Sequence, residues 1–303
     1  MTDTESTTTT SATATPHRAR RSRRRSGLLS IRRSRTATAG AVMLVILALT
    51  AVFAPQLATH EPFRQDLRAR LAPPSWDVRT PNSHVLGTDQ LGRDVLSRVI
   101  YGTRISLLVG VSVVLLAGTL GTLLGLVAGF LGGRVDTILM RIVDVFLAFP
   151  FLLLAIIFMA MLGASLGNII LVLAITGWVE YARVVRSQVL SVRELEYVTA
   201  AKALGARSLV IMLKHVLPNV FASVIVIASL QLGTVIIAEA SLTFLGLGIP
   251  PSIPTWGSML ASGREYFVLA WWLPTFPGLA IVLTVLAVNF LGDWLRDVFD
   301  PTL

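Results

Sequence analysis

The side chains that could carry out chemistry are few in this sequence and are scattered along it. The four histidines are His17, His60, His84 and His215, which are too dispersed to form a metal constellation. Cysteine is absent, so disulfides, zinc–thiolate clusters and thiol nucleophiles are excluded. The sequence has no serine–histidine–carboxylate grouping and no pair of carboxylates at catalytic spacing. It therefore predicts a protein that is not an enzyme and has no metal site.

ATP hydrolysis by the usual phosphate-binding loop is also excluded. That loop needs a lysine within a G-x-x-x-x-G-K-[ST] pattern, where it reaches the β- and γ-phosphates. The two lysines, Lys202 and Lys214, both lie outside such a pattern. We therefore expect no cofactor in this chain. If the protein drives transport, its energy comes from partner subunits or from an ion gradient.

Polar side chains within apolar stretches are the remaining candidates, because a buried carboxylate in a membrane can relay protons. We place the four relevant carboxylates near the ends of the apolar stretches, where water reaches them: Asp144, Glu180, Glu239 and Asp293. The uncharged groups Ser229, Gln231 and Thr234 lie at mid-depth instead, and we expect them to line a translocation path. An ion-coupled transporter is the alternative that these carboxylates leave open.

The composition requires a membrane around these residues. Apolar residues make up 54% of the sequence and charged residues only 14%, which is far from the average of a soluble domain. A span needs about 20 apolar residues to cross the bilayer. On this criterion we predict an all-α integral membrane protein with six spans, at about 37–58, 105–131, 145–162, 168–185, 220–242 and 273–291.

The remaining segments divide the chain into four parts. Residues 1–36 form a basic tail that we expect to be disordered and cytoplasmic, and residues 37–58 form the first helix, which we expect to remain uncleaved. Residues 59–104 form an extracytoplasmic loop with an amphipathic helix, and residues 105–303 form the core. Nine arginines in the tail favour a cytoplasmic N-terminus and contact with lipid headgroups over binding to nucleic acid.

The polar segment Glu194–Asn219 separates two long uncharged stretches. Its pattern predicts a first helix with Tyr197, Ala200, Ala201 and Leu204 on one face, and Gly205 as the left-handed residue that ends it. Ser208 is expected to cap a second helix, 209–216, and Pro218 to stand in the first turn of the fifth span. The result is a two-helix elbow on the cytoplasmic side. An amphipathic connector in the headgroup plane is the alternative.

Two further patterns concern packing and the outer loop. Gly121, Gly125, Gly129 and Gly133 recur every four residues in the second span, which predicts a stripe for close helix packing. In the outer loop, Asp94 and Arg98 stand at i,i+4 spacing on a predicted helix and are expected to pair. A calcium site at Asp89 and Asp94 is disfavoured because the ligands are too few.

Two blocks resemble a known family. The loop residues Glu196, Tyr197, Ala200, Ala201, Gly205, Leu217 and Pro218 resemble the EAA loop of ATP-binding-cassette importer permeases. The block from Gly87 to Arg98, G-T-D-Q-L-G-R-D-V-L-S-R, resembles the second permease of peptide and nickel importers. The sequence departs from the usual EAA motif at Thr199, where a glutamate is common, and at His215, where an isoleucine is common.

This resemblance implies a type I importer permease fold and a set of partners. These partners are a homologous permease that forms a heterodimer, two ATPase subunits that bind ATP and magnesium, an extracytoplasmic substrate-binding protein, and lipid. In the family, the EAA loop seats the permease on the ATPase. The implied cargo is di- or oligopeptides, and nickel chelates are the alternative; peptide length and cargo such as haem or glutathione are not specified.

Overall fold

The computed structural model describes residues 35–77 and 83–299, so the predicted tail lies almost entirely outside the described residues. The described chain is helical, and its one β-bridge joins Thr88 to Asp94. The helices of five or more residues, apart from a π-helical turn, are α2 (Arg35–Val52), α4 (Val95–Leu131), α5 (Gly133–Leu147), α6 (Phe151–Leu162), α7 (Leu166–Val192), α8 (Glu196–Ala203), α10 (Leu217–Phe244), α11 (Trp256–Gly263) and α12 (Trp272–Phe299). Two short α-helices, α3 (Ala54–Leu57) and α9 (Ser208–Ile211), lie between these longer ones.

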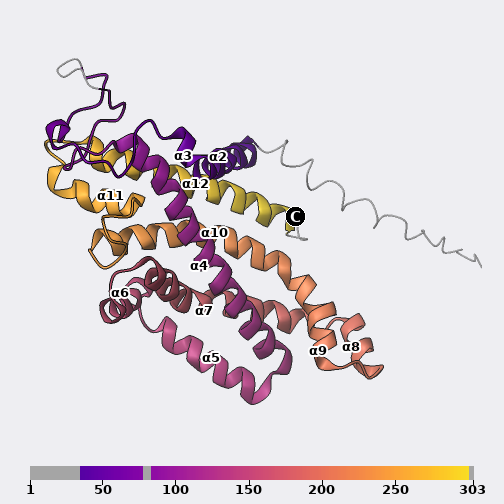
Figure 1. Ribbon diagram of the computed structural model, residues 1–303. Helices are drawn as coiled ribbons and strands as arrows, with labels where there is room; N and C mark the ends of the chain where they lie inside the picture. Colours follow the sequence, from indigo (N-terminus) through magenta and orange to yellow (C-terminus); the bar gives the residue numbers. More distant parts are fainter. Residues whose placement is uncertain (1–34, 78–82, 300–303) are drawn as a thin grey trace, which may run out of the picture.

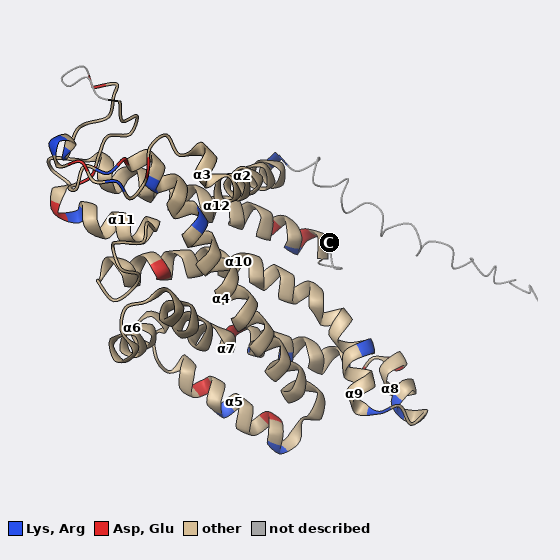
Figure 2. Cartoon of the chain, in the orientation of Figure 1, with Lys and Arg blue, Asp and Glu red and all other residues tan. Residues whose placement is uncertain are grey.

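Long apolar helices make up the bundle (Figure 1). Within the described residues, five helices are long and apolar enough to cross a membrane: α2, α4, α7, α12 and the run Ser208–Phe244, which joins α9 to α10. The pair α5 and α6 passes the same test together, and counting it gives six. Most charged residues lie at the two ends of the bundle and on α5, and a few lie within the long helices, as Figure 2 shows. This distribution is what a bilayer around the middle requires.

The third predicted span is not one continuous helix. Residues 145–162 were expected to form it, but α5 ends at Leu147 and α6 begins at Phe151, with a bend of 86° between them. Pro150 accounts for the break, because proline lacks an N–H and disfavours helical geometry in the residue before it. Helix α5 carries Asp136 and Asp144 and is amphipathic, whereas the twelve residues of α6 are all apolar.

Helices α4 and α7 form the closest contact in the bundle. A Cβ on Gly121 would lie 2.3 Å from the carbonyl oxygen of Trp178, and one on Gly125 would lie 2.5 Å from that of Ala182. A Cβ on Gly129 would lie 2.8 Å from Cβ of Val189 and 3.0 Å from the carbonyl oxygen of Arg186. The two backbones therefore meet directly, and this contact lies within the chain. Gly133 is not part of it, since nothing lies within 4 Å of its Cβ position and its φ of +54° marks the start of α5.

The remaining spans surround this pair. Helix α10 packs on α12 and α4, and α2 packs along α12, where a Cβ on Gly40 would meet the carbonyl oxygen of Ala287 at 2.8 Å. The outer side of α2 exposes Val42, Val45 and Ile46. Apolar side chains in such positions suit a lipid environment.

A polar cap, residues 58–77 and 83–94, covers one end of the bundle beside α11, and α8 and α9 lie at the other end (Figure 1). Thr88 connects the cap to the bundle, because its carbonyl oxygen accepts from Trp272 Nε1 at 3.1 Å and its hydroxyl accepts from the Ala72 N–H at 2.8 Å. Asp89 accepts from Arg93 Nε at 2.7 Å and lies 3.6 Å from Arg98 Nε.

The predicted pairing of Asp94 with Arg98 is therefore wrong. Arg98 turns toward Asp89, and Asp94 instead caps the N-terminus of α4 by accepting from the Ser97 N–H at 2.8 Å. As the N-cap residue, Asp94 directs its side chain to the free N–H groups of the first turn rather than along the helix surface. Asp89 and Asp94 thus face different partners.

The glycine contact predicts a stability difference between two single substitutions. Gly125→Ala places a methyl group against the backbone of α7 and should lower the free energy of unfolding by about 1–3 kcal/mol, as overpacking does. Gly167→Ala is the matched control, because this helical glycine has nothing within 4 Å of its Cβ position. Thermal unfolding of the detergent-solubilised protein measures both. Equal midpoints would contradict a direct α4–α7 backbone contact.

Candidate functional site

The segment 194–219 folds as a helical hairpin. Helix α8 ends at Ala203, and Gly205 follows its C-cap residue with a φ of +75°, the left-handed conformation predicted for it. Beyond the turn, α9 begins at Ser208 and continues through a π-helical turn, Met212–Val216, into α10. Pro218 stands in the first turn of α10, as predicted. We call residues 194–219 the hairpin.

The second arm of the hairpin differs from the prediction in two ways. Ser208 is the first helical residue rather than the cap, because the N-cap position is Arg207 and no side chain caps it. Residues 212–216 form a π-turn, not an α-helix. Pro218 lacks an N–H and its ring crowds the carbonyl four residues earlier, which favours a wider turn there. Asn219 Nδ2 donates to the carbonyl oxygen of His215 at 2.5 Å.

Apolar side chains anchor the hairpin to the bundle. Val198 of α8 and Ile211 and Val216 of the second arm are fully or almost fully buried. They belong to a core cluster with Leu126 of α4 and Val189 of α7. Arg193, just before the hairpin, donates through Nη1 to the carbonyl oxygen of Gly129 at 2.8 Å. The hairpin is therefore fixed to the same two helices that meet along the glycines.

The outer surface of α8 is exposed. Tyr197, Ala200 and Leu204 all face outward, and Leu204 has 88% of its surface exposed. Ala201 was expected on the same face, but it turns partly inward against the core cluster. Glu196 and Pro218 are exposed, and Leu217 is half-buried. A small residue at Ala200 between two large apolar neighbours is a surface on which another protein can pack closely.

A pocket of about 270 Å³ lies among α4, the end of α5, α6, α7 and α10. Gln231 and Thr234 both line it, as does Glu180, and Gln231 Nε2 donates to Glu180 Oε2 at 2.6 Å. Ser229 does not line it, since it faces α12, where a Cβ on Gly292 would be 2.9 Å from Ser229 Oγ. Two of the three predicted path residues therefore share one pocket.

The two membrane carboxylates do not lie where the sequence placed them. Glu180 was expected near the end of a span, but α7 runs from Leu166 to Val192 and Glu180 is close to its middle. Glu239 was expected in contact with water, but it is only 1% exposed. Helix α11 folds back over Glu239, and the Glu239 Oε1 atom accepts from the hydroxyls of Thr243 at 3.0 Å and Thr255 at 3.2 Å.

The histidines were predicted to be too scattered for a metal site, and this is wrong for two of them. The fold brings the side chains of His60 and His84 together, with ring centroids 4.5 Å apart. They are 24 residues apart in irregular segments, where no periodicity in the sequence predicts a contact. His215 lies in the hairpin beside Tyr197, and His17 is outside the described residues.

Comparison with known protein families identifies the family of this chain. Residues 121–303 match the family described as the binding-protein-dependent transport system inner membrane component. The chain belongs to this family. The match covers Gly121, Gly125 and Gly129 of α4, the whole hairpin, and the pocket residues that come from α5, α6, α7 and α10. Residues 22–74 also match the N-terminal transmembrane domain of oligopeptide transport permease C.

Curated relatives of this inner membrane component are similar along most of their length. The di/tripeptide transport system permease protein DppC of Pseudomonas aeruginosa is 44% identical over 274 residues, which is 90% of each chain. The dipeptide transport system permease protein DppC of Escherichia coli is 47% identical over 90% of this chain and 91% of its own. The protein of the same name from Bacillus subtilis is 43% identical over 90% and 84%.

The buried Glu239 predicts how α11 is held. Glu239→Ala leaves the hydroxyls of Thr243 and Thr255 without their acceptor and should lower the free energy of unfolding by about 1–3 kcal/mol. Glu239→Gln keeps an acceptor oxygen and should cost less. Hydrogen exchange of the α11 amides measures the effect locally. If the α11 amides of both variants exchange as slowly as those of the wild type, Glu239 does not hold α11 in place.

Proposed function

We propose that this chain is the membrane subunit of an ATP-driven importer that moves di- or oligopeptides into the cytoplasm. The observation that carries the proposal is the identity of 43–47% with dipeptide and di/tripeptide permeases over about 90% of the chain. The lack of a phosphate-binding loop in the sequence agrees with a subunit that leaves ATP hydrolysis to others. In this role the chain is not an enzyme.

The partners follow from the same role. The chain pairs with a homologous permease, two ATPase subunits bind ATP and magnesium at the cytoplasmic side, and an extracytoplasmic binding protein delivers the cargo. The family description, a binding-protein-dependent transport component of the inner membrane, supports the last of these. No cofactor is assigned to this chain itself.

The hairpin is the part that contacts the ATPase. Its outward residues Tyr197, Ala200 and Leu204 form the docking face, and its buried residues Val198 and Ile211 connect that face to the bundle. A displacement of the hairpin by the ATPase moves α4 and α7 with it, because these helices share one core cluster with the hairpin. The pocket with Glu180 and Gln231 lies between the same helices.

Pocket chemistry agrees with varied cargo. The lining is mostly apolar, with a few polar groups, among them the bonded pair Glu180 and Gln231. The carboxylate of Glu180 is already paired with Gln231, and the hydroxyl and amide groups beside it bind peptide backbones weakly, so cargo can leave again. Ser229 lies outside this pocket, since it packs against Gly292 of α12.

Both termini lie in the cytoplasm in this proposal, which places the hairpin there too. The arginines before α2 and the basic residues of the hairpin support this orientation. Because the chain has no cysteine, single cysteines can be labelled without background. Ser208→Cys should react with a membrane-impermeant maleimide only after the cells are opened. Gln65→Cys, at an exposed position of the polar cap, should react in intact cells, and the reverse pattern would refute the orientation.

Docking at Ala200 predicts a loss of coupling without a loss of folding. Ala200 is exposed, so Ala200→Glu should not disturb the chain itself, but in a packed interface it leaves a desolvated charge that costs several kcal/mol. Peptide uptake and co-purification of the ATPase should fall at least tenfold. Ala164→Glu, in the exposed turn between α6 and α7, is the matched control and should leave both unchanged. Equal activity of the two variants would make the hairpin a plain connector.

Cargo is tested in cells that lack this gene. Uptake of labelled di- and tripeptides should be lost and should return when the wild-type gene is restored, while uptake of nickel stays normal. Loss of nickel uptake with normal peptide uptake would assign the chain to nickel chelates instead. The experiment is independent of the hairpin, so the two tests fail separately.

A further inference from the structure

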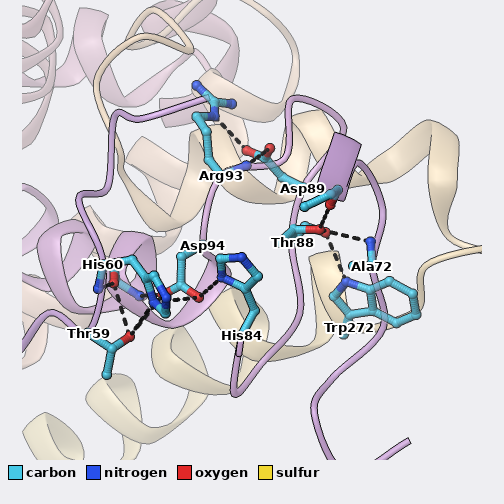
Figure 3. A network of polar contacts seen from close by, with 11 residues as sticks. Thr59, His60, Ala72, His84, Thr88, Asp89, Arg93, Asp94 and Trp272 are labelled. Carbon is cyan, nitrogen blue, oxygen red and sulfur yellow. Dashed lines mark hydrogen bonds and ion pairs between the residues drawn. The ribbon is translucent and has the colours of Figure 1, made fainter. Parts of the chain in front are cut away.

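Three side chains from separate parts of the polar cap converge on one point (Figure 3). His60 follows the short helix α3, His84 precedes the turn at Gly87, and Asp94 is the N-cap of α4. His84 Nδ1 is 2.9 Å from Asp94 Oδ1, and His60 Nδ1 is 3.7 Å from the same oxygen. One ligand atom from each residue lies within 4.8 Å of the other two.

His84 Nδ1 is at hydrogen-bonding distance from Asp94 Oδ1, and His60 Nδ1 is 3.2 Å from the Thr59 hydroxyl, but the three ligand atoms also lie close enough together to share one metal ion. Zinc binds nitrogen and oxygen ligands at about 2.0–2.2 Å in a tetrahedron, so neighbouring ligand atoms are about 3.3–3.6 Å apart. The two distances to Asp94 Oδ1, 2.9 and 3.7 Å, lie on either side of that range, and all three ligand atoms lie within 4.8 Å of one another. Only His84 is within hydrogen-bonding distance of Asp94 Oδ1. A cation between the three atoms would engage both rings with small shifts.

Hydrogen bonds fix the carboxylate of Asp94 in an orientation that suits a metal ion. The side chain of Asp94 is fully buried, and its second oxygen, Oδ2, accepts from the Ser97 N–H at 2.8 Å and from the Thr59 hydroxyl at 3.3 Å. Ser97 Oγ in turn accepts from the His60 N–H at 3.0 Å. These bonds leave Oδ1 facing the rings. Outer bonds of this kind orient the ligands of metal sites.

One side of the cluster is open to solvent. His60 and His84 have 35% and 16% of their side-chain surface exposed, respectively. A fourth ligand can therefore be water, and an ion can enter from outside. Two imidazoles with one carboxylate favour zinc and similar transition ions over magnesium or calcium, which prefer all-oxygen sites.

We propose that His60, His84 and Asp94 bind one divalent transition metal ion of the zinc type. The ion connects the segment after α3 to the start of α4 and to the loop at His84. It thereby fixes the first membrane helix and the polar cap to the core of the bundle. This role is structural, and it does not depend on which cargo the protein carries.

The test uses the full chain, purified in detergent without a polyhistidine tag and treated with chelator. Zinc is titrated by calorimetry, and thermal unfolding is followed with and without zinc. The wild type should bind one zinc ion per chain and unfold at a higher temperature with zinc present. Cobalt in its place should give the visible absorption of a tetrahedral site. Magnesium should have no effect.

Variants assign the ion to these residues. His60→Ala and His84→Ala should each weaken zinc binding at least tenfold and abolish the thermal shift. Asp94→Asn should do the same, and because asparagine is also a good N-cap, the start of α4 should remain intact. His215→Ala, at the other end of the bundle, is the control and should bind zinc as the wild type does.

Two results would overturn the proposal. The first is that the wild type binds no zinc at micromolar concentration. The second is that binding persists unchanged in His60→Ala and Asp94→Asn, which would place the ion elsewhere. Circular dichroism of each variant separates loss of the site from loss of the fold.

Discussion

The direct contact between the backbones of α4 and α7 is the constraint on which the rest of the structure depends. Gly121 and Gly125 leave no room for a side chain, so the two helices are held at a fixed distance. In lipid this packing must come from close van der Waals contact, because helices gain nothing there by hiding apolar surface from water. Arg193 then joins the end of this pair to the hairpin through Gly129.

The two ends of the bundle are organised differently around that pair. At one end an apolar cluster holds the hairpin and leaves Ala200 and Leu204 exposed, where a partner can contact them. At the other end a polar network around Asp89 and Asp94 holds the cap on the bundle. The pocket lies between them, so a movement at the hairpin can reach it through rigid helices.

Most of the fold could be predicted from the sequence, because the length of an apolar stretch predicts a membrane span. Gly205 favours the left-handed conformation that follows a helix, and Pro218 favours the first turn of one. What could not be predicted depends on contacts between distant segments. Glu239 is buried because α11 folds back over it, and the spacing of residues along α10 does not predict this contact. The contact between His60 and His84 also joins segments that are distant in the sequence. That Arg98 pairs with Asp89 rather than Asp94 likewise depends on the tertiary structure.

The central claim is that this chain is a passive gate moved by ATPases docked at the hairpin. The most direct measurement is uptake of a labelled dipeptide into liposomes that contain this chain, its partner permease and the two ATPases, with the binding protein on the side of the polar cap. The account predicts uptake that requires ATP and stops when the ATPases are left out. Uptake by the purified chain alone, driven by a proton gradient, would contradict it.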